Sequence, residues 1–309
     1  MRLLIVNQRA PEYAALIKKE LPDLEISVAK NKSEIPPSIE DVDIILAWRV
    51  PKDVLKKAVN VRWLASTGAG VDHLILPWLG KDVVITKAPP IFGRLIAEYV
   101  MGYALHVSLG VENVLSNKQK KLWAVPERSA LGGRLMGILG MGSIGTEIAR
   151  AARCMGMKVW GVRRSAAPSP DADRVFGPKE LKDFLPHPDF LVIALPLTEE
   201  TRDLIGSDEL SLVKSTAWII NVGRGRVLGE EALVRKLGQG GLGGYVADVF
   251  ATEPLPKESP LWELSNVIIT PHYAALTSPE EFVPSFVDNV RRFEAGRPLL
   301  FQIDRQKGY

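Results

Sequence analysis

Short apolar runs rich in β-branched residues alternate with stretches of helical period along almost the whole chain. Runs of this length are typical of buried strands, and strands separated by helices indicate parallel sheets covered by helices. The pattern therefore predicts the doubly wound α/β class. The predicted strands are residues 2–8, 24–30, 42–48, 62–68, 83–88, 134–140, 158–164, 189–196, 217–223, 244–250 and 266–272.

The predicted strands fall into two series, which indicates two doubly wound domains. The first series ends before about residue 90 and the second begins after about residue 134. Residues 94–123 lie between them and form a long helical stretch with apolar side chains on more than one face. A helix of this kind is usually buried, either between domains or at a subunit contact.

The final helix carries a capping-box pattern at its start. Ser278 stands at the cap, Pro279 at the first helical position and Glu281 three residues beyond the cap. We expect the serine and glutamate side chains to bond the backbone N–H groups of this first turn. Pro284 lies just inside the helix and is expected to bend it.

Composition and charge exclude several classes of protein. The 309 residues are 46% apolar and 24% charged, which is typical of a soluble globular protein of two domains. The net charge is +3, and no Lys/Arg tract with interleaved aromatic residues indicates nucleic-acid binding. No apolar run reaches the ~20 residues that cross a membrane, and the start becomes polar too soon for a signal peptide. The single cysteine, Cys154, permits no internal disulfide and fits a reducing cytoplasm, where we expect the protein to act.

A glycine-rich turn follows the predicted strand 134–140 and precedes a helical stretch. Its spacing is G-x-G-x-x-G, in which the first glycine makes a tight turn, the second admits a pyrophosphate and the third lets helix pack on strand. Backbone N–H groups at the helix start then face the phosphates. The alternative is a tight turn that holds no ligand. The predicted dinucleotide loop consists of Gly140, Met141, Gly142, Ser143, Ile144 and Gly145.

The next strand ends on two cations where a dinucleotide fold usually has an acid. Arg163 and Arg164 are followed by Ser165, and residues 146–162 separate Gly145 from this cluster. An acid at that distance accepts hydrogen bonds from the ribose hydroxyls, whereas arginines and a hydroxyl suit a 2′-phosphate. We therefore predict NADP(H), with NAD(H) possible if the arginines are merely solvated.

Three further strands end at or near residues whose side chains together suit catalysis on a keto acid. Arg224, Glu253 and His272 follow the strands 217–223, 244–250 and 266–272 or end them, at the edge where open α/β sheets bind ligands. Histidine suits proton donation to a ketone oxygen, and a neighbouring carboxylate favours its charged form. Arginine suits a two-pronged grip on a substrate carboxylate. Taken singly, each residue also fits an ordinary surface, loop or strand-end role.

Other candidate residues carry less information. His73, His106 and His187 stand in no partner pattern and are interpreted as structural or solvent-facing. Trp48 and Arg49 follow a strand and either line the mouth of a cleft or form a packed aromatic with an exposed cation. No Cys/His or paired-carboxylate spacing indicates a metal site.

The chain resembles the D-isomer-specific 2-hydroxyacid dehydrogenases over nearly its whole length. The resemblance lies in an ordered series of segments, and the tail 289–309 is most similar to the glyoxylate/hydroxypyruvate reductase branch. The segments are STGAGVDHL, GILGMGSIG, ALPLTEETRDLI, NVGRGRVLGEEAL, DVFATEPLPKESPLW and TPHYA.

The resemblance implies a particular domain organisation. A flavodoxin-like substrate domain comprises residues 1–95 and is completed by residues 276–309. A Rossmann-type dinucleotide-binding domain, residues 96–275, is inserted into it, with the active site in the cleft between the two. Family members usually form dimers through the linking helix, a role that the apolar faces of residues 94–116 would suit.

The resemblance also implies residue roles. Arg224 binds the substrate carboxylate together with the backbone amides of Ala69 and Gly70, His272 is the acid/base, and Glu253 is its partner. Asp248 bonds the nicotinamide amide. The remaining residues implied to contact the cofactor, besides the glycine loop and residues 163–165, are Leu195, Pro196, Thr201, Val222, Gly223 and His272.

The expected function is NADP-dependent reduction of a small 2-keto acid, of the glyoxylate/hydroxypyruvate type, to its D-2-hydroxy acid. Two alternatives remain. The substrate could be another D-2-hydroxy acid, such as lactate, glycerate or a larger one. The chain could also be a nucleotide-sensing interaction protein, similar to the transcriptional corepressors that share the fold. The peptide-binding segments expected of such corepressors are missing from the sequence, which favours the enzyme.

Overall fold

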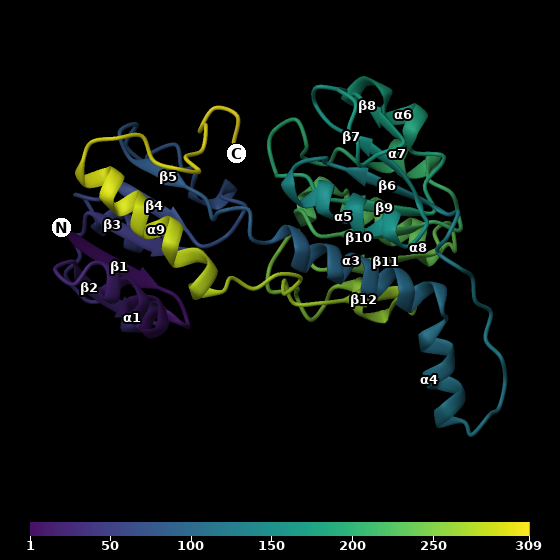
Figure 1. Ribbon diagram of the computed structural model, residues 1–309. Helices are drawn as coiled ribbons and strands as arrows, with labels where there is room; N and C mark the ends of the chain where they lie inside the picture. Colours follow the sequence, from purple (N-terminus) through teal and green to yellow (C-terminus); the bar gives the residue numbers. More distant parts are fainter. Residues whose placement is uncertain (309) are drawn as a thin grey trace. The chain divides into compact units, whose positions relative to one another are not determined.

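The computed structural model describes residues 1–308 and divides into two compact units. One unit combines Met1–Ile91 with the chain from Leu276 onward, and the other is the continuous segment Phe92–Ala275 (Figure 1). Each unit contains one parallel sheet, so the predicted α/β class with two parallel-sheet domains is confirmed.

The first unit is a five-stranded parallel sheet of order β2-β1-β3-β4-β5, the flavodoxin-like order. Its strands are β1 (Arg2–Val6), β2 (Glu25–Ala29), β3 (Ile44–Ala47), β4 (Trp63–Ser66) and β5 (Val84–Thr86). Its helices are α1 (Ala10–Glu20), α2 (Lys52–Lys57), α9 (Pro279–Glu294) and the single 3₁₀ turns Lys32–Glu34 and Asp72–Leu74.

The C-terminal helix completes the core of this unit. The ring of Phe286 on α9 stacks on Trp63 of β4 at 5.1 Å between centroids, and Phe282 meets Tyr13 of α1 edge-on. The backbone N–H of Ile303 donates to the carbonyl of Ile85 at 3.0 Å. The N-terminal sheet is therefore covered in part by residues from the far end of the chain.

The second unit is a seven-stranded parallel sheet of order β12-β11-β10-β9-β6-β7-β8, the Rossmann order with its reversal between β6 and β9. Its strands are β6 (Leu135–Leu139), β7 (Lys158–Val162), β8 (Arg174–Phe176), β9 (Phe190–Ile193), β10 (Trp218–Asn221), β11 (Gly244–Ala247) and β12 (Val267–Ile269). Its helices are α3 (Gly93–Ser108), α4 (Val111–Gln119), α5 (Ser143–Cys154), α6 (Leu181–Phe184), α7 (Ser207–Leu212) and α8 (Glu230–Gly238), with 3₁₀ turns at Pro178–Glu180, Gly225–Val227 and Pro260–Glu263.

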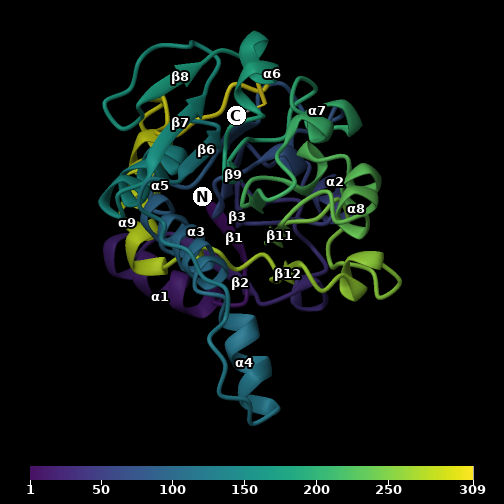
Figure 2. The same cartoon turned by 90° about the vertical axis from the view of Figure 1, so that its right-hand side faces the viewer.

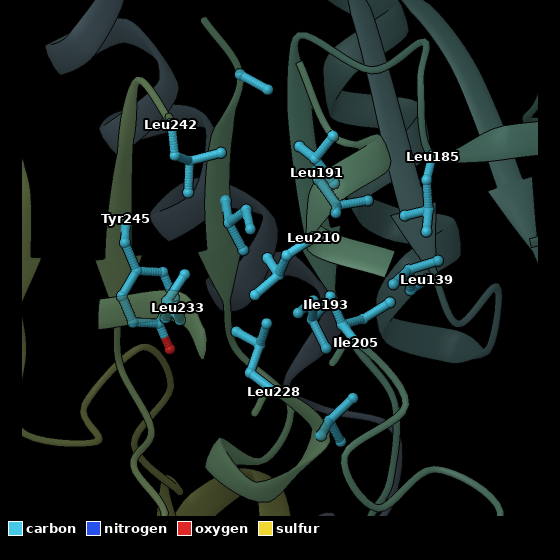
Figure 3. Packing of buried hydrophobic residues seen from close by; sticks show 14 of the residues in the cluster. Leu139, Leu185, Leu191, Ile193, Ile205, Leu210, Leu228, Leu233, Leu242 and Tyr245 are labelled. Atoms are coloured by element: carbon cyan, nitrogen blue, oxygen red, sulfur yellow. The ribbon is translucent and has the colours of Figure 1, made fainter. Parts of the chain in front are cut away.

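A continuous apolar cluster packs one face of this sheet (Figure 3). Leu191 and Ile193 of the central strand β9 are fully buried, and Leu210 of α7 and Leu233 of α8 pack in the same cluster. Burial on this scale fixes the strands relative to one another. The residues that follow their carboxyl ends consequently stand on a rigid frame.

The long helical stretch predicted at 94–123 is wrong as a single helix. Gly110 adopts a left-handed backbone with φ of +64°, and it separates α3 from α4. A left-handed residue changes the direction of the chain, and glycine adopts it without a steric penalty. As a result, α4 and the segment after it extend away from the sheet of their unit (Figures 1 and 2). The second unit begins at Phe92 and α3 at Gly93, while the domain boundary expected at residues 95 and 96 stays a prediction.

Two local predictions also differ from the structure. β8 was not predicted, because it has only three residues and is held by pairing with β7 rather than by its own pattern. The capping box at Ser278 is wrong: no side chain caps α9, and the Ser278 hydroxyl donates instead to Glu280. Within residues 1–308, none of the helices has both the length and the apolar character needed to span a bilayer.

Candidate active site

The glycine loop occupies the turn from β6 to α5, next to the reversal in strand order. Gly140 has a φ of +105°, and a Cβ there would lie 2.7 Å from the carbonyl oxygen of Ala194. A Cβ on Gly145 would collide with the carbonyl of Gly140. The first and third glycines are therefore required by the turn and by the close packing of helix on strand.

Gly142 differs from the other two glycines, because a Cβ there would meet no heavy atom of the described chain within 4 Å. The space beside its backbone is open. Gly142 is also the N-cap of α5, and no side chain caps that helix. The N–H groups of the first turn, which includes Ser143 and Ile144, therefore suit an anionic group such as a pyrophosphate. The loop fits a dinucleotide.

Arg163, Arg164 and Ser165 form a tight turn directly after β7. The N–H of Ala166 closes the turn on the carbonyl of Arg163 at 3.2 Å. The Nε of Arg163 is buried and has no hydrogen-bond partner within the described chain, while Nη2 of Arg164 lies 2.8 Å from Oε2 of Glu200. Since a buried donor without an acceptor is unfavourable, Arg163 is suited to an added anion.

The glycine loop is tied to this turn by Met141. Its side chain packs so closely on Gly161 of β7 that a Cβ at Gly161 would lie 2.8 Å from the Met141 sulfur. The pyrophosphate loop and the arginine turn are thus held in a fixed relation. Both lie at the carboxyl ends of adjacent strands, β6 and β7.

The turn that follows β9 and the turn that follows β10 are also in contact with each other. The hydroxyl of Thr201 donates to the carbonyl of Pro196 at 2.7 Å, which closes the turn after β9. A Cβ on Gly223 would lie 2.6 Å from the carbonyl oxygen of Leu195, so the turn after β10 packs directly on the turn after β9. The N–H of Val222 donates to the carbonyl of Ile193 at 3.0 Å, so Val222 lies in the same junction. The structure thus brings these five predicted cofactor residues into two touching turns.

His272 and Glu253 are in direct contact. Nδ1 of the imidazole lies 2.9 Å from Oε2 of Glu253, and the two side chains are 26% and 16% exposed. The other carboxylate oxygen of Glu253 accepts the backbone N–H of Phe250 at 3.1 Å, which fixes its orientation. This contact fixes the orientation of the imidazole ring and determines which of its nitrogens faces Glu253.

Arg224 lies in the turn between β10 and the following 3₁₀ turn. Buried Asn221 shapes this turn: its Nδ2 donates to the carbonyl of Arg224 and its Oδ1 accepts the N–H of Gly223, both at 3.1 Å. Gly225 packs on the backbone of Phe250, where any Cβ would collide. Since β10, β11 and β12 are neighbours, the three predicted catalytic residues follow three adjacent strands of one sheet.

Asp248, predicted to bond the nicotinamide amide, makes three hydrogen bonds within its own unit. Its Oδ1 accepts the hydroxyl of Thr270 at 2.6 Å and the N–H of Tyr273 at 2.9 Å, while Oδ2 accepts the N–H of Ala274 at 3.1 Å. Asp248 is 2% exposed. A carboxylate offers about four acceptor sites, so one remains on Oδ2 for another donor.

Ala69 and Gly70, predicted to bind a substrate carboxylate, belong to the first unit and follow β4. The ring of Trp48 packs against neighbouring Gly68, where a Cβ would lie 2.7 Å from Cδ1 of the indole. The guanidinium of Arg49 lies 4.5 Å from the centroid of the same ring. This turn is therefore backed by an aromatic wall, and the exposed Ala69 stands beside it.

Known proteins of one family are similar to this chain. Residues 101–274 match the NAD-binding domain of D-isomer specific 2-hydroxyacid dehydrogenases. The chain belongs to this family. It is 31% identical to glyoxylate/hydroxypyruvate reductase A of Klebsiella pneumoniae, over 97% of this chain and 96% of the relative.

Solved structures of the D-2-hydroxyacid dehydrogenase family superpose closely on this chain. A family member from Aeromonas salmonicida is 38% identical with a TM-score of 0.92, covering 98% of this chain and 99% of that one. An NADPH-dependent glyoxylate/hydroxypyruvate reductase from Sinorhizobium meliloti, solved with NADP and sulfate, is 28% identical with a TM-score of 0.89, covering 100% and 99%. Membership of the family makes this chain an oxidoreductase with a nicotinamide cofactor.

The other predicted histidines make local contacts in this dehydrogenase fold. Nε2 of His106 lies 3.2 Å from Glu112, and the ring of His187 lies 5.0 Å from that of Trp160. Nε2 of His73 lies 2.5 Å from the carbonyl of Trp48. Within residues 1–308, no group of three or more His, Cys, Asp or Glu side chains is placed to hold a metal ion.

Three side chains that were not predicted from the sequence bond the predicted site, directly or through one another. Thr270 bonds Asp248, Tyr99 bonds Thr270 at 2.7 Å, and Glu200 pairs with Arg164. Thr270 lies in the TPH segment, two residues before His272, which is a signal that could have singled it out. Tyr99 is 171 positions from its partner, and no sequence pattern links the two.

Proposed function

We propose that this chain is an NADP-dependent reductase of small 2-keto acids of the glyoxylate/hydroxypyruvate type, yielding D-2-hydroxy acids. The observation that carries the proposal is the contact between Nδ1 of His272 and Glu253. A carboxylate-oriented imidazole at the ligand-binding edge of a dinucleotide fold is the acid/base that carbonyl reduction requires. Curated relatives named glyoxylate/hydroxypyruvate reductase A support the substrate class.

Each of the three predicted catalytic residues has a separate role in the proposed reaction. Arg224 binds the substrate carboxylate through paired charge-assisted hydrogen bonds, which orients the keto group. His272 donates a proton from Nε2 to the keto oxygen, while Glu253 holds the ring through Nδ1 and stabilises its positive charge. A bound nicotinamide supplies the hydride. The roles of Ala69 and Gly70 stay predictions.

The preference for NADP(H) is supported by the turn after β7. Arg163, Arg164 and Ser165 present donors where a ribose-binding acid would repel a 2′-phosphate. The buried Nε of Arg163 gains a partner when a phosphate arrives. Two family members were solved with NADPH or NADP, at 29% and 28% identity to this chain.

We also propose that the enzyme is a homodimer. The segment from α4 onward exposes apolar side chains that a single chain leaves in water: Leu122 is 55% exposed, Trp123 101% and Val125 88%. Neighbouring exposed apolar groups of this size are typical of an interface. Sedimentation of the protein and of Trp123→Glu tests this; a monomeric parent protein would contradict it. The cytoplasmic location expected from the single cysteine stays a prediction.

The proposed activity is tested by following NADPH oxidation with glyoxylate, hydroxypyruvate, pyruvate and larger 2-keto acids. Glyoxylate or hydroxypyruvate is expected to give the highest kcat/KM. His272→Gln is expected to lower kcat by about 10²–10⁴, the usual effect of positioned acid–base catalysis, while NADPH still binds. Preference for pyruvate or a bulky keto acid would contradict the substrate class. Cofactor binding without turnover of any keto acid would favour the corepressor-like alternative.

A further inference from the structure

A chain of three buried polar groups leads from helix α3 to the segment that carries His272. The hydroxyl of Tyr99 lies 2.7 Å from Oγ1 of Thr270, and that Oγ1 lies 2.6 Å from Oδ1 of Asp248. The three residues are 9%, 5% and 2% exposed. Since water is excluded here, these groups depend on one another for their hydrogen bonds.

The direction of the protons follows from the chemistry of the three groups. An ionised carboxylate only accepts hydrogen bonds, and Oδ1 of Asp248 at 2.6 Å is nearer to the Thr270 hydroxyl than the carbonyl of Ala247 at 3.3 Å, so Thr270 donates its one proton to Asp248. The oxygen of Thr270 is then the acceptor for Tyr99. Burial raises the pKa of the Tyr99 phenol, which therefore keeps its proton. The chain runs in one direction, from Tyr99 through Thr270 to Asp248.

The Asp248 carboxylate in turn clamps the backbone on the far side of His272. It accepts the N–H of Tyr273 at 2.9 Å and that of Ala274 at 3.1 Å. Thr270 before the histidine and residues 273–274 after it are thus fixed to one carboxylate. His272 between them has a φ of +52°, a left-handed backbone conformation that is unfavourable for a non-glycine residue. Such a conformation persists where the surroundings enforce it.

We infer that Thr270 and Tyr99 are positioning residues, which orient Asp248 so that its clamp holds His272 in the left-handed conformation and keeps its ring on Glu253. The inference rests on the proposed function. It adds two residues that hold the proposed acid/base, His272, in position. It also assigns the Asp248 carboxylate a structural role, the fixing of the backbone around His272, which does not require a bound cofactor. The Thr270 hydroxyl bonds Asp248 and the Tyr99 hydroxyl bonds Thr270, while the only bond from Thr270 to His272 is between backbone atoms, so within residues 1–308 both side chains act through the clamp.

The decisive variant is Thr270→Val, which keeps the shape of the side chain and removes the hydroxyl. We expect kcat to fall by about 10²-fold, because a small displacement of a catalytic group has that effect. The Kd for NADPH is expected to stay within about threefold of the parent. Thr270→Ser keeps the hydroxyl and should restore most of kcat. Tyr99→Phe, which keeps the ring packed 4.6 Å from Tyr103, should give a smaller loss of kcat.

A second readout does not depend on turnover. The imidazole proton resonances of His272, assigned by their loss in His272→Gln, are followed by NMR as the pH is raised. In Thr270→Val we expect the ring to lose its proton at a lower pH than in the parent, because its contact with Glu253 is loosened. If this shift occurs in a protein that reduces no keto acid, the proposed function fails and the positioning role stands.

The control is Thr86→Val, which removes another buried hydroxyl, one that accepts the indole N–H of Trp63 in the first unit. It should lower the Tm without moving kcat or the His272 titration. The inference is overturned if Thr270→Val behaves like this control. It is equally overturned if Thr270→Val weakens NADPH binding tenfold or more at unchanged kcat, because Asp248 would then act on the cofactor and not on the histidine.

Discussion

Nη2 of Arg164 lies 2.8 Å from Oε2 of Glu200, so one of the two cations proposed to bind a 2′-phosphate is already paired with an acid. The side chains are 53% and 74% exposed, and a pair as exposed as this exchanges readily with water. A phosphate that arrives at Arg164 must displace the Glu200 carboxylate or accept its repulsion. We therefore predict that Glu200 competes with the 2′-phosphate of NADP(H) for Arg164.

Glu200→Gln is expected to lower the KM for NADPH by about twofold to fivefold, the range that an exposed ion pair supports. The KM for NADH should not change, since NADH lacks the phosphate. The matched control is Glu199→Gln, whose side chain is 91% exposed and lies 3.5 Å from Arg202 instead. Steady-state kinetics with both cofactors measure the effect. A raised KM for NADPH would show that Glu200 helps to hold Arg164 for the phosphate.

Replacing Arg163 by Asp and Arg164 by Ala should reverse the cofactor preference. If each arginine contributes about 1.5 kcal/mol to phosphate binding, the pair favours NADPH by about a hundredfold. An aspartate at position 163 would also bond the ribose hydroxyls of NADH. The ratio of kcat/KM for the two cofactors, measured before and after the change, tests this. Equal values in the unchanged protein would contradict a role for the arginines.

Arg224→Lys is expected to lower kcat/KM for keto acids by at least about tenfold, because lysine cannot supply paired donors to a carboxylate. Binding of NADPH should remain. Arg226→Lys, two residues further along the same turn and exposed, is the matched control. If both variants reduce keto acids as the parent does, Arg224 is structural.

Glu253→Gln should move the alkaline limb of keto acid reduction to lower pH. Reduction needs the protonated imidazole, and the variant removes the negative charge 2.9 Å from its Nδ1. Without that charge the ring loses its proton at a lower pH, so activity declines earlier as the pH rises. The profile of kcat/KM between pH 5 and about pH 9 measures the shift. An unmoved limb would mean that the contact only orients the ring.

Asp189→Ala tests the frame of the second unit. Burial raises the pKa of Asp189, but the N–H of Leu135 and the ammonium of Lys214 outweigh this and hold it below its ordinary 3.8. Its contribution is therefore complete above pH 3.8 and lost as the pH falls through the lower folded value. We expect a loss of about 2 kcal/mol, constant between pH 8 and about pH 5. Urea unfolding measures it, with exposed Asp23→Ala as the control; a loss that grows or vanishes in this range would contradict the assignment.

The fold class could be predicted because alternating strands and helices leave a strong periodic signal. The exceptions have local causes. Strand β8 is too short for a pattern and depends on its neighbour β7. The helix expected at 94–123 ends early because Gly110 adopts a left-handed backbone. A glycine within a helical pattern does not by itself indicate that the helix stops there. Ser278 fits a capping pattern, yet its hydroxyl is bonded to Glu280.

The candidate site was predictable at the level of motifs and not of contacts. The glycine loop has its spacing written in consecutive residues, and the conformation of Gly140 and the open space at Gly142 agree with it. The contact of Glu253 with His272 was an expectation of family resemblance. The pair of Arg164 with Glu200 joins residues 36 positions apart, and that of Tyr99 with Thr270 spans 171. Such contacts arise only from tertiary packing.

The packing of α9 on β4 determines the order in which the chain can fold during synthesis. The sheet of the first unit is translated early, but Phe286, which stacks on Trp63, is made only after the whole middle unit. Residues 92–275 are continuous, so they can form their sheet as soon as they leave the ribosome. Until the last residues follow, the N-terminal strands expose the apolar face that α9 later covers. The first part of this protein to be made is thus the last to be completed, and in that interval it is the part exposed to aggregation.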